Sequence, residues 1–332
     1  MSSGQPTPNV LIFGTGGVGC VYSYILSAAG CTVTTVCRTN YSAVKAHGIS
    51  IRSKIFGRVH FHPKAVQTCA EAATHGPFDY IIACNKAFPG SSALLKDAIT
   101  AESTIVLAQN GIGIEDEYTT AYPTNTLISG VVYLPVTQVS PGVVEMGPLE
   151  RFEIGTYPPS APTDKATQLA SLWAAGGATA AVYPDIQPQR WIKVAVNASW
   201  NPVCALTLCD DANFLRSSAE AEDMALRLMR LVGRIAREAL GYDVVTEEVI
   251  QRQMQRHRDR LETGGKEPSM LTDVRMGRGL EVEAILGNTV RIARGLGLQD
   301  EVRELEVLYV LAKGLDFAIR SPDEWKGIAR HD

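Results

Sequence analysis

The sequence predicts an α/β domain built on a parallel sheet, followed by a domain made only of helices. Up to about residue 183, apolar stretches of strand length alternate with helical stretches, as in parallel sheets. After the turn-rich segment Pro184–Pro188, every apolar pattern has the helical period. With 332 residues, of which 45% are hydrophobic, the chain is long enough for two such domains. We place them at residues 1–186 and 187–332.

A glycine-rich loop lies between the first strand and the first helix. The strand covers 9–13, the helix 18–29, and a second strand 32–36. The loop between them is formed by Gly14, Thr15, Gly16, Gly17, Val18 and Gly19. A G-x-G-x-x-G sequence that joins a strand to a helix is typical of a Rossmann domain. Its glycines let the backbone approach a pyrophosphate at the positive end of the helix. This stretch therefore predicts a dinucleotide site.

The end of the second strand indicates which dinucleotide binds. An NAD site has an acidic residue there for the ribose 2′-hydroxyl, whereas an NADP site has a cation for the 2′-phosphate. Here the strand is followed by Arg38, and there is no Asp or Glu before Glu71. The sequence therefore favours NADP(H), with Arg38 as the ligand of the 2′-phosphate and Thr39 or Lys45 assisting.

Two polar segments follow later strands of the first domain. We expect further strands at 79–84, 104–108, 126–133, 143–146, 152–155 and 180–183, and helices at 91–99 and 163–175. Lys86 comes directly after the first of these strands, and Asn110 after the second. Each residue alone is compatible with an ordinary surface turn. Because the carboxyl ends of parallel strands form the ligand-binding edge, we expect both to contact cofactor or substrate.

The first helix of the second domain, at 191–209, carries an unusual polar stripe. It is almost entirely apolar, yet Lys193, Asn197 and Asn201 recur every four residues and so share one side of the helix. A solvated face would be rich in Lys, Glu and Arg, whereas this stripe has one cation and two amides. We interpret it as one wall of a binding cleft. Pro202 cannot donate to Ala198, so a kink is expected there.

The remaining helices of the second domain are expected at 219–240, 247–263, 269–275, 281–296 and 301–319. Ser269 and Asp273 are candidate caps of the third of these helices, and the last is expected to be amphipathic. The net charge of −4 disfavours nucleic acid as a partner. Seven cysteines without a C-x-x-C pair indicate neither a disulfide framework nor a zinc site. No stretch resembles a signal peptide or a membrane span, so we expect a cytoplasmic protein.

Taken together, five motifs resemble the ketopantoate reductases (2-dehydropantoate 2-reductases). They are the glycine loop, Asn85-Lys86-Ala87, Gln109-Asn110-Gly111-Ile112-Gly113, Lys193-x3-Asn197-x3-Asn201-Pro202, and Ser269-Met270-Leu271-x-Asp273-x7-Glu281. The resemblance implies a Rossmann domain followed by an all-α domain similar to the C-terminal domain of 6-phosphogluconate dehydrogenase. It also implies NADPH-dependent reduction of ketopantoate to (R)-pantoate, a step towards pantothenate.

The resemblance further implies a role for each motif residue. Lys193 would donate a proton to the carbonyl oxygen, and Glu281 would lie near Lys193 and the nicotinamide ribose. The cofactor would be held by Gly14 to Gly19, Arg38, Lys86 and Asn110. Substrate contacts would come from Asn110, Lys193, Asn197, Asn201, Asn213 and Ser269. No metal is implied, the partner is a small 2-keto acid, and a homodimer is possible.

Two departures from the family pattern leave the substrate open. Leu286 stands before Gly287 where many members have Asn, and Trp200 is bulkier than the usual residue beside the second amide. One alternative is therefore a reductase of a different carbonyl compound. Another is a protein that senses NADP(H) without catalysis, although a sensor has no need of the proton donor Lys193.

Overall fold

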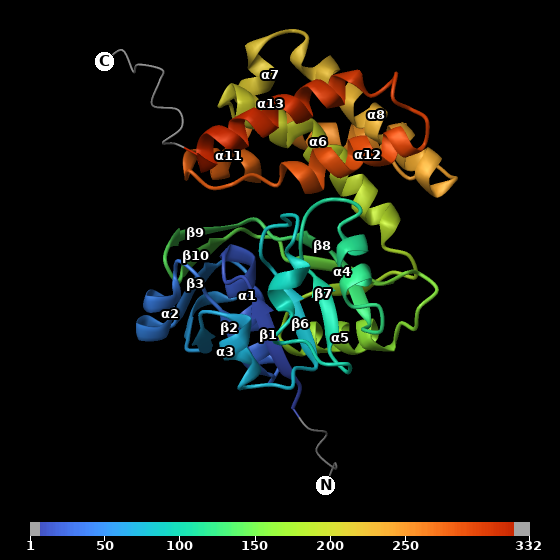
Figure 1. Ribbon diagram of the computed structural model, residues 1–332. Coiled ribbons are helices and arrows are strands. Elements are labelled where there is room, and N and C mark those ends of the chain that lie inside the picture. Colours follow the sequence, from blue (N-terminus) through green and yellow to red (C-terminus); the bar gives the residue numbers. More distant parts are fainter. Residues whose placement is uncertain (1–6, 322–332) are drawn as a thin grey trace. The chain divides into compact units, whose positions relative to one another are not determined.

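The structure is a computed structural model that describes residues 7–321. Residues 1–6 and 322–332, at the outer ends of the two predicted domains, lie outside the described residues. The chain forms two compact units (Figure 1). The first contains the chain up to Gln109 together with Ile114–Ile186. The second contains Asn110–Gly113 and the chain from Gln187 onward, so one short loop of the α/β half belongs by its contacts to the helical half.

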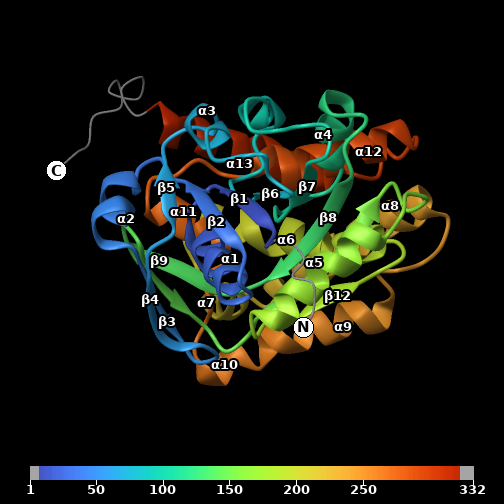
Figure 2. The same cartoon turned by 90° about the horizontal axis from the view of Figure 1, so that it is seen from below.

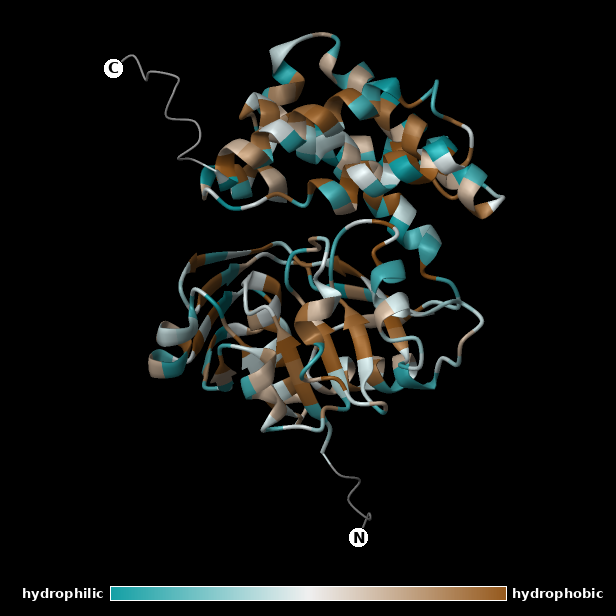
Figure 3. Cartoon of the chain, in the orientation of Figure 1, coloured by the Kyte–Doolittle hydropathy of each residue, from teal (hydrophilic) through white to brown (hydrophobic). Residues whose placement is uncertain are grey.

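The first unit is built on an eight-stranded sheet in the order β12-β11-β8-β7-β6-β1-β2-β5. Its strands are β1 (Asn9–Phe13), β2 (Thr32–Val36), β5 (Lys64–Val66), β6 (Tyr80–Ala83), β7 (Thr104–Leu107), β8 (Leu127–Tyr133), β11 (Arg151–Tyr157) and β12 (Ala180–Val182). All pairs are parallel except β8 with β11. Figure 3 shows the central strands in brown, as expected for strands buried on both faces. The predicted α/β class is confirmed.

Helices cover both faces of this sheet. Figure 2 shows α1 (Gly17–Ala28) and α5 (Asp164–Ala175) on one side of the strands, and α3 (Cys69–Ala73) and α4 (Glu115–Ala121) on the other. The helix α1 ends at Ala28, one residue before the predicted end. Gly30 has a φ of +87°, and the N–H of Cys31 donates to Leu26 O at 2.9 Å, which closes the last turn. The prediction of a helix at 91–99 is wrong, because this segment forms only a short 3-10 helix, η1 (Ser92–Leu95).

A second, four-stranded sheet was not predicted. It consists of β4 (Gly57–Phe61), β3 (Ile49–Ser53), β10 (Val143–Met146) and β9 (Val136–Ser140), in that order. The strands β3, β9 and β10 contact α1. Only β10 was expected from the sequence, because the other strands are short and carry polar residues on alternate positions. Since β3 pairs with β10, this sheet depends on contacts between residues more than 90 positions apart.

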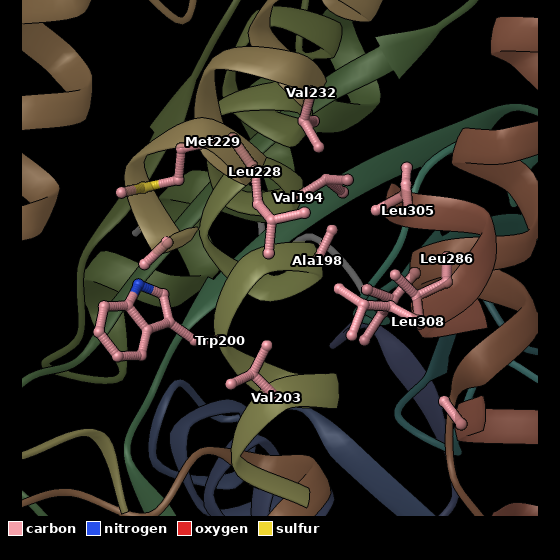
Figure 4. Packing of buried hydrophobic residues seen from close by; sticks show 14 of the residues in the cluster. Val194, Ala198, Trp200, Val203, Leu228, Met229, Val232, Leu286, Leu305 and Leu308 are labelled. Carbon is pink, nitrogen blue, oxygen red and sulfur yellow. The ribbon is translucent and has the colours of Figure 1, made fainter. Parts of the chain in front are cut away.

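The second unit is helical throughout the described residues. It contains α6 (Gln187–Thr207), α7 (Asp211–Ser217), α8 (Ala221–Leu240), α9 (Glu247–Arg258), α10 (Arg260–Thr263), α11 (Ser269–Arg275), the π-helix η2 (Glu283–Gly287), α12 (Asn288–Gly295) and α13 (Arg303–Arg320). The central helix is α6, which packs against α8, α11 and α13. Figure 4 shows Val194 and Ala198 of α6 among leucines from α8, η2 and α13. Among the described residues, no helix is long and apolar enough to cross a membrane.

The start of the central helix differs from its prediction. It starts at Gln187, four residues earlier than expected, so Pro188 lies in its first turn, where proline is tolerated. It continues through Pro202 without a break. The predicted caps of α11 are also wrong, because Pro268 occupies the N-cap position and Ser269 is the first helical residue.

Candidate active site

The glycines after β1 have different surroundings. Gly14 has a φ of +95°, and a Cβ atom there would lie 2.5 Å from the backbone nitrogen of Asn85. A Cβ atom on Gly19 would lie 2.1 Å from the carbonyl oxygen of Gly14. By contrast, a Cβ atom on Gly16 would meet nothing within 4 Å. Gly14 and Gly19 are therefore required for packing, whereas Gly16 leaves open space in front of α1.

This open space lies at the N-terminus of α1. Gly16 is the N-cap residue and supplies no side-chain cap, and the first turn contains no acidic residue. The first N–H groups of a helix have no partner within the helix, and its dipole favours negative charge at this end. A pyrophosphate fits these donors and the space at Gly16. The residues present therefore fit a dinucleotide cofactor.

Two buried side chains join the glycine loop to the end of β2. The hydroxyl of Thr15 donates to Val36 O at 2.9 Å, and the amide of Asn40 donates to Thr15 O at 2.6 Å. Both side chains are buried. Sequence reasoning missed Asn40, which stands two residues after Arg38. Its amide fixes the distance between the loop and the segment that carries the candidate phosphate ligand.

The cations of the acid-free stretch are not equivalent in the structure. Arg38 is exposed in the turn after β2, next to this hydrogen-bonded junction. Lys45, on α2 (Tyr41–His47), donates to the hydroxyl of Tyr41 at 2.9 Å. Arg52 instead forms an ion pair with Glu145 across the second sheet, at 2.9 Å. Of these cations, Arg38 has the position closest in the chain to the glycine loop.

The ends of β6 and β7 are linked by side chains. The amide of Gln109 donates to the backbone and side-chain oxygens of Asn85 at 3.0 and 3.1 Å. The amide of Asn85 in turn donates to Lys86 O at 2.9 Å. Lys86 is half-buried in this turn. Asn85 also lies against Gly14, so these hydrogen bonds fix the turn carrying Lys86 beside the glycine loop.

In the second unit, the polar stripe of α6 becomes more buried along the helix. Lys193 and Asn197 are half-buried, and Asn201 is only 3% exposed. Among the described residues, none provides a hydrogen-bond acceptor for the amide nitrogen of Asn201. An unsatisfied buried donor costs about 1–3 kcal/mol. Such a donor beside a lysine and a second amide indicates a site for a ligand that carries acceptor oxygens.

The loop Asn110–Gly113 belongs to the same unit and contacts the start of η2. The amide of Asn110 donates to the Glu281 carboxylate at 3.1 Å, and Glu281 is buried. The N–H of Ile112 donates to Ala284 O at 3.1 Å. Gly111 has a φ of +108°, and a Cβ atom there would lie 2.5 Å from Ala284 O. The π-helix thus presents a carbonyl that holds the loop, and the loop places Asn110 on Glu281.

Arg190 holds this loop from a second direction. Its guanidinium donates to Gly111 O at 2.9 Å, and its side chain is only 2% exposed. It lies in the first turn of α6, ahead of Lys193. Sequence reasoning missed Arg190 because the helix was expected to start one residue later, at Trp191. A cation just ahead of an apolar helix was the available signal.

The predicted substrate ligands Asn213 and Ser269 are both exposed, at the starts of α7 and α11. The amide of Asn213 donates to the side chain of Asp210 at 2.9 Å. Asp211 links the two helix starts, because its carboxylate accepts the N–H of Lys266 at 2.7 Å, three residues before Ser269. The structure therefore connects these helix starts through a residue that sequence reasoning did not identify.

Asp211 is almost fully buried and lies 2.8 Å from His257 Nδ1, with Arg260 as a second partner. Burial by itself would raise the pKa of Asp211, but hydrogen bonds from His257, Lys266 and Arg260 outweigh it and lower the pKa. Burial lowers the pKa of His257, and Asp211 offsets this only in part. Trp200 stacks on His257 with ring centroids 3.9 Å apart. Trp200 and Leu286, the two departures from the family pattern, are therefore core residues (Figure 4).

Comparison with known proteins identifies the family to which the chain belongs. Residues 10–159 match the family model Ketopantoate reductase PanE/ApbA, and residues 185–316 match the model of its C-terminal part. An uncharacterized protein of Saccharomyces cerevisiae is 25% identical, with 97% of each chain covered. The crystal structure of 2-dehydropantoate 2-reductase from Methylococcus capsulatus is similar with a TM-score of 0.81 and 30% identity. That similarity covers 94% of this chain and 97% of the other.

A further solved structure is that of D-mandelate dehydrogenase with NADH and anilino(oxo)acetate. It matches with a TM-score of 0.82 and 20% identity, covering 94% of this chain and 99% of the other, and so shares the fold. The Rossmann-type unit and the matched models define an oxidoreductase that uses a nicotinamide cofactor. The chain belongs to the ketopantoate reductase family.

Proposed function

We propose that this protein reduces the ketone of 2-dehydropantoate (ketopantoate) to (R)-pantoate with NADPH, a step in pantothenate biosynthesis. The observation that carries this proposal is the stripe of α6, which has one cation and two amides. Its last member, Asn201, is buried, and its amide nitrogen has no hydrogen-bond partner among residues 7–321. A 2-keto acid presents carboxylate and carbonyl oxygens, which only accept hydrogen bonds. Lys193, Asn197 and Asn201 supply donors with a single positive charge.

Lys193 is proposed as the proton donor. A bound nicotinamide cofactor would supply the hydride that reduces the keto carbon, and negative charge would then develop on the carbonyl oxygen. The ammonium group of Lys193 stabilises this developing charge and then transfers its proton to the oxygen.

Glu281 is proposed to support Lys193. A carboxylate favours the charged form of a neighbouring lysine, so Glu281 would keep the donor protonated between turnovers. Asn110 holds this carboxylate at 3.1 Å through its amide. Asn110 is in turn fixed by the contacts of Ile112 with η2 and of Gly111 with Arg190. In this proposal, the loop acts by orienting the carboxylate.

Preference for NADPH over NADH is proposed from the end of β2. Arg38 is exposed there, and no carboxylate precedes Glu71 in the sequence. A 2′-phosphate gains a charge-assisted hydrogen bond from Arg38, whereas an NAD ribose would find no acidic acceptor on this stretch. The junction through Asn40 holds this turn beside the pyrophosphate loop.

A second candidate is the reduction of a different 2-keto acid. D-mandelate dehydrogenase has the same fold, so the fold alone does not select the side chain of the acid. The stripe recognises acceptor oxygens, which all 2-keto acids share. A protein that binds NADP(H) without catalysis is less well supported, because it would not need a lysine beside two amides.

The proposal is tested by measuring steady-state NADPH consumption with ketopantoate and with a panel of other 2-keto acids. Ketopantoate is expected to give the highest kcat/KM. A rate with smaller 2-keto acids and none with ketopantoate would support the second candidate. No rate with any 2-keto acid would contradict the reductase assignment.

The stripe itself is tested with Asn201→Ala. Loss of a hydrogen bond to a charged substrate group costs about 1.5–3 kcal/mol, which corresponds to a roughly 10- to 100-fold rise in KM. Thr207→Ala, at the exposed end of the same helix, is the matched control and should leave KM unchanged. An unchanged KM in Asn201→Ala would remove the observation on which the proposal rests.

A further inference from the structure

The π-helix η2 changes the backbone hydrogen bonding beside the loop Asn110–Gly113. The N–H of Asn288 donates to Glu283 O, five positions back along the chain. In an α-helix this N–H would donate to Ala284 O, four positions back. The wider turn therefore leaves Ala284 O available to another donor, and it accepts the N–H of Ile112 at 3.1 Å. The π-turn thus provides the carbonyl that holds the loop, in agreement with the frequent occurrence of such turns at functional sites.

The side chain of Asn288 holds the same loop at a second point. Its amide donates to Ile112 O at 2.7 Å, while its side-chain oxygen accepts a hydrogen bond from Arg291 at 2.5 Å. Ile112 is thus bonded to the helix through both its N–H and its C=O. Arg291 in turn forms an ion pair with Glu283 at 2.8 Å. The contacts of the loop therefore lead, through two side chains, to Glu283.

Glu283 is the centre of a cluster of charged and polar side chains. Its carboxylate accepts a hydrogen bond from the hydroxyl of Tyr309 at 2.8 Å and pairs with Lys313 at 2.9 Å, both on α13. Burial would raise the pKa of Glu283, but hydrogen bonds from Lys313, Arg291 and Tyr309 outweigh this effect and lower the pKa. The charged carboxylate therefore joins the π-turn to α12 and α13.

Gly287 provides the space for this carboxylate. A Cβ atom on Gly287 would lie 2.5 Å from Glu283 Oε2 and 3.2 Å from Arg291 Nη1. Its φ of −59° and ψ of −48° are ordinary helical values, so the backbone does not require glycine here. Within a helix, glycine is less favourable than alanine. The glycine is therefore explained by the space that the cluster occupies.

We propose that Glu283 is a positioning residue of the reductase site. It holds the π-turn, the turn holds the loop Asn110–Gly113, and the loop directs the amide of Asn110 onto the Glu281 carboxylate at 3.1 Å. This inference rests on the proposed function, in which Glu281 supports the proton donor Lys193. Glu283 acts on turnover through this series of hydrogen bonds.

Glu283→Gln tests the first half of this series without any turnover. Glutamine keeps the size of the side chain but removes the charge on which the ion pairs depend. Amide hydrogen exchange of Ile112, followed by mass spectrometry, should become about tenfold faster. Glu306→Gln is the matched control, because Glu306 also joins α13 to α12, through Arg294 at 2.8 Å, and its side chain is 27% exposed against 25% for Glu283. This control should leave the exchange of the loop unchanged.

Steady-state kinetics tests the second half, with NADPH and the 2-keto acid that gives the highest kcat/KM. Glu283→Gln should lower kcat about tenfold, because a displaced supporting group no longer favours the productive geometry. KM should stay within about twofold, since the stripe of α6 is unchanged. In an Asn110→Ala background, Glu283→Gln should lower kcat no further, because the residue through which it acts is already missing. A general loss of structure would instead add to the effect of Asn110→Ala.

Gly287→Ala separates positioning from stability. The added methyl group should displace the Glu283 carboxylate, so loop exchange should become faster and kcat should fall. Because alanine is favoured over glycine in a helix, Tm should not fall. Gly295→Ala is the control, because a Cβ atom at this position in α12 would meet nothing within 4 Å, and it should leave kcat unchanged.

Two results would overturn the proposal. One is unchanged exchange of Ile112 in Glu283→Gln, which would show that Glu283 does not hold the loop. The other is faster exchange with an unchanged kcat, which would show that the loop does not position Glu281. Hydrogen exchange needs no turnover, so it also separates this inference from the proposed function: a protein that reduces no 2-keto acid contradicts the function, whereas the exchange of Ile112 decides whether Glu283 holds the loop.

Discussion

The glycine loop of the first unit and the polar stripe of the second unit are proposed to bind their ligands in opposite ways. The loop would bind through backbone N–H groups carried on six consecutive residues, Gly14 to Gly19. The stripe would bind through side chains on a regular helix, and the carboxylate proposed to support it accepts a hydrogen bond from a residue 171 positions away. In this proposal, the size of each residue matters most in the loop. In the stripe, the chemistry of the side chain matters most.

The largest expected effect concerns the stripe. Lys193→Ala removes the proton donor and should lower kcat about 10²- to 10⁴-fold, because general acid catalysis contributes on this scale. Cofactor affinity, followed by NADPH fluorescence, should be unchanged, since the loop is intact. Lys96→Ala, at an exposed lysine of the first unit, is the control. Unchanged turnover in Lys193→Ala would show that another group delivers the proton.

The next effect separates packing from binding within the loop. Gly19→Ala places a methyl group 2.1 Å from Gly14 O and should lower the free energy of unfolding by about 3 kcal/mol. Gly16→Ala meets no atom within 4 Å and should leave the unfolding curve unchanged while weakening NADPH binding. Urea unfolding and fluorescence titration measure the two quantities. Equal stability of the two variants would contradict the different roles assigned to these glycines.

A smaller effect is expected at Arg38. Arg38→Ala removes one charge-assisted contact with the 2′-phosphate and should reduce the preference for NADPH over NADH about tenfold. The ratio of kcat/KM for the two cofactors measures it. Arg52→Ala is the control, because Arg52 pairs with Glu145 in the second sheet. If the ratio stays the same in Arg38→Ala, cofactor choice is made elsewhere.

The smallest effect is a pH dependence confined to the second unit. Because burial lowers the pKa of His257 in the folded state, the unfolded chain binds more protons between that pKa and about 6.5. The free energy of unfolding should therefore fall as pH drops below about 6.5, and the low pKa of Asp211 extends the loss at more acidic pH. Urea midpoints at neutral and mildly acidic pH measure it. In His257→Gln, the free energy of unfolding should depend less on pH. If its dependence on pH is unchanged, His257 is not the cause of the loss of stability.

Most strands of the main sheet could be predicted, because they are continuous apolar segments bounded by turn residues. The observed β1, β2 and β10 have the predicted bounds, and α1 ends at Ala28, one residue before the predicted end. The second sheet was not predicted, because its strands are short and its β3–β10 pair joins segments more than 90 residues apart. The segment 91–99 has helical composition but keeps only one 3-10 turn.

For the candidate site, residue spacing identified the candidate binding residues but not the residues that hold them in place by hydrogen bonds. The stripe of α6 and the motif at Asn110 could be predicted from short stretches. Arg190, Asn40 and Asp211 could not, because each acts through contacts with residues 25 to 79 positions away. The exposed apolar residues Val307, Val310 and Phe317 on α13 were also not predicted, because the apolar residues of this helix were all assigned to one buried face.

By itself, the sequence determined the α/β and helical classes, the nucleotide loop and the order of polar residues on α6. These features follow from local rules, namely residue period, glycine geometry and helix rotation. Only the tertiary structure decided that Asn110–Gly113 docks on a π-helix and that the buried amide nitrogen of Asn201 has no hydrogen-bond partner in the described part of the chain. Those features depend on which distant segments meet. Local sequence patterns do not specify such contacts, because they form only when segments far apart in the sequence pack together during folding.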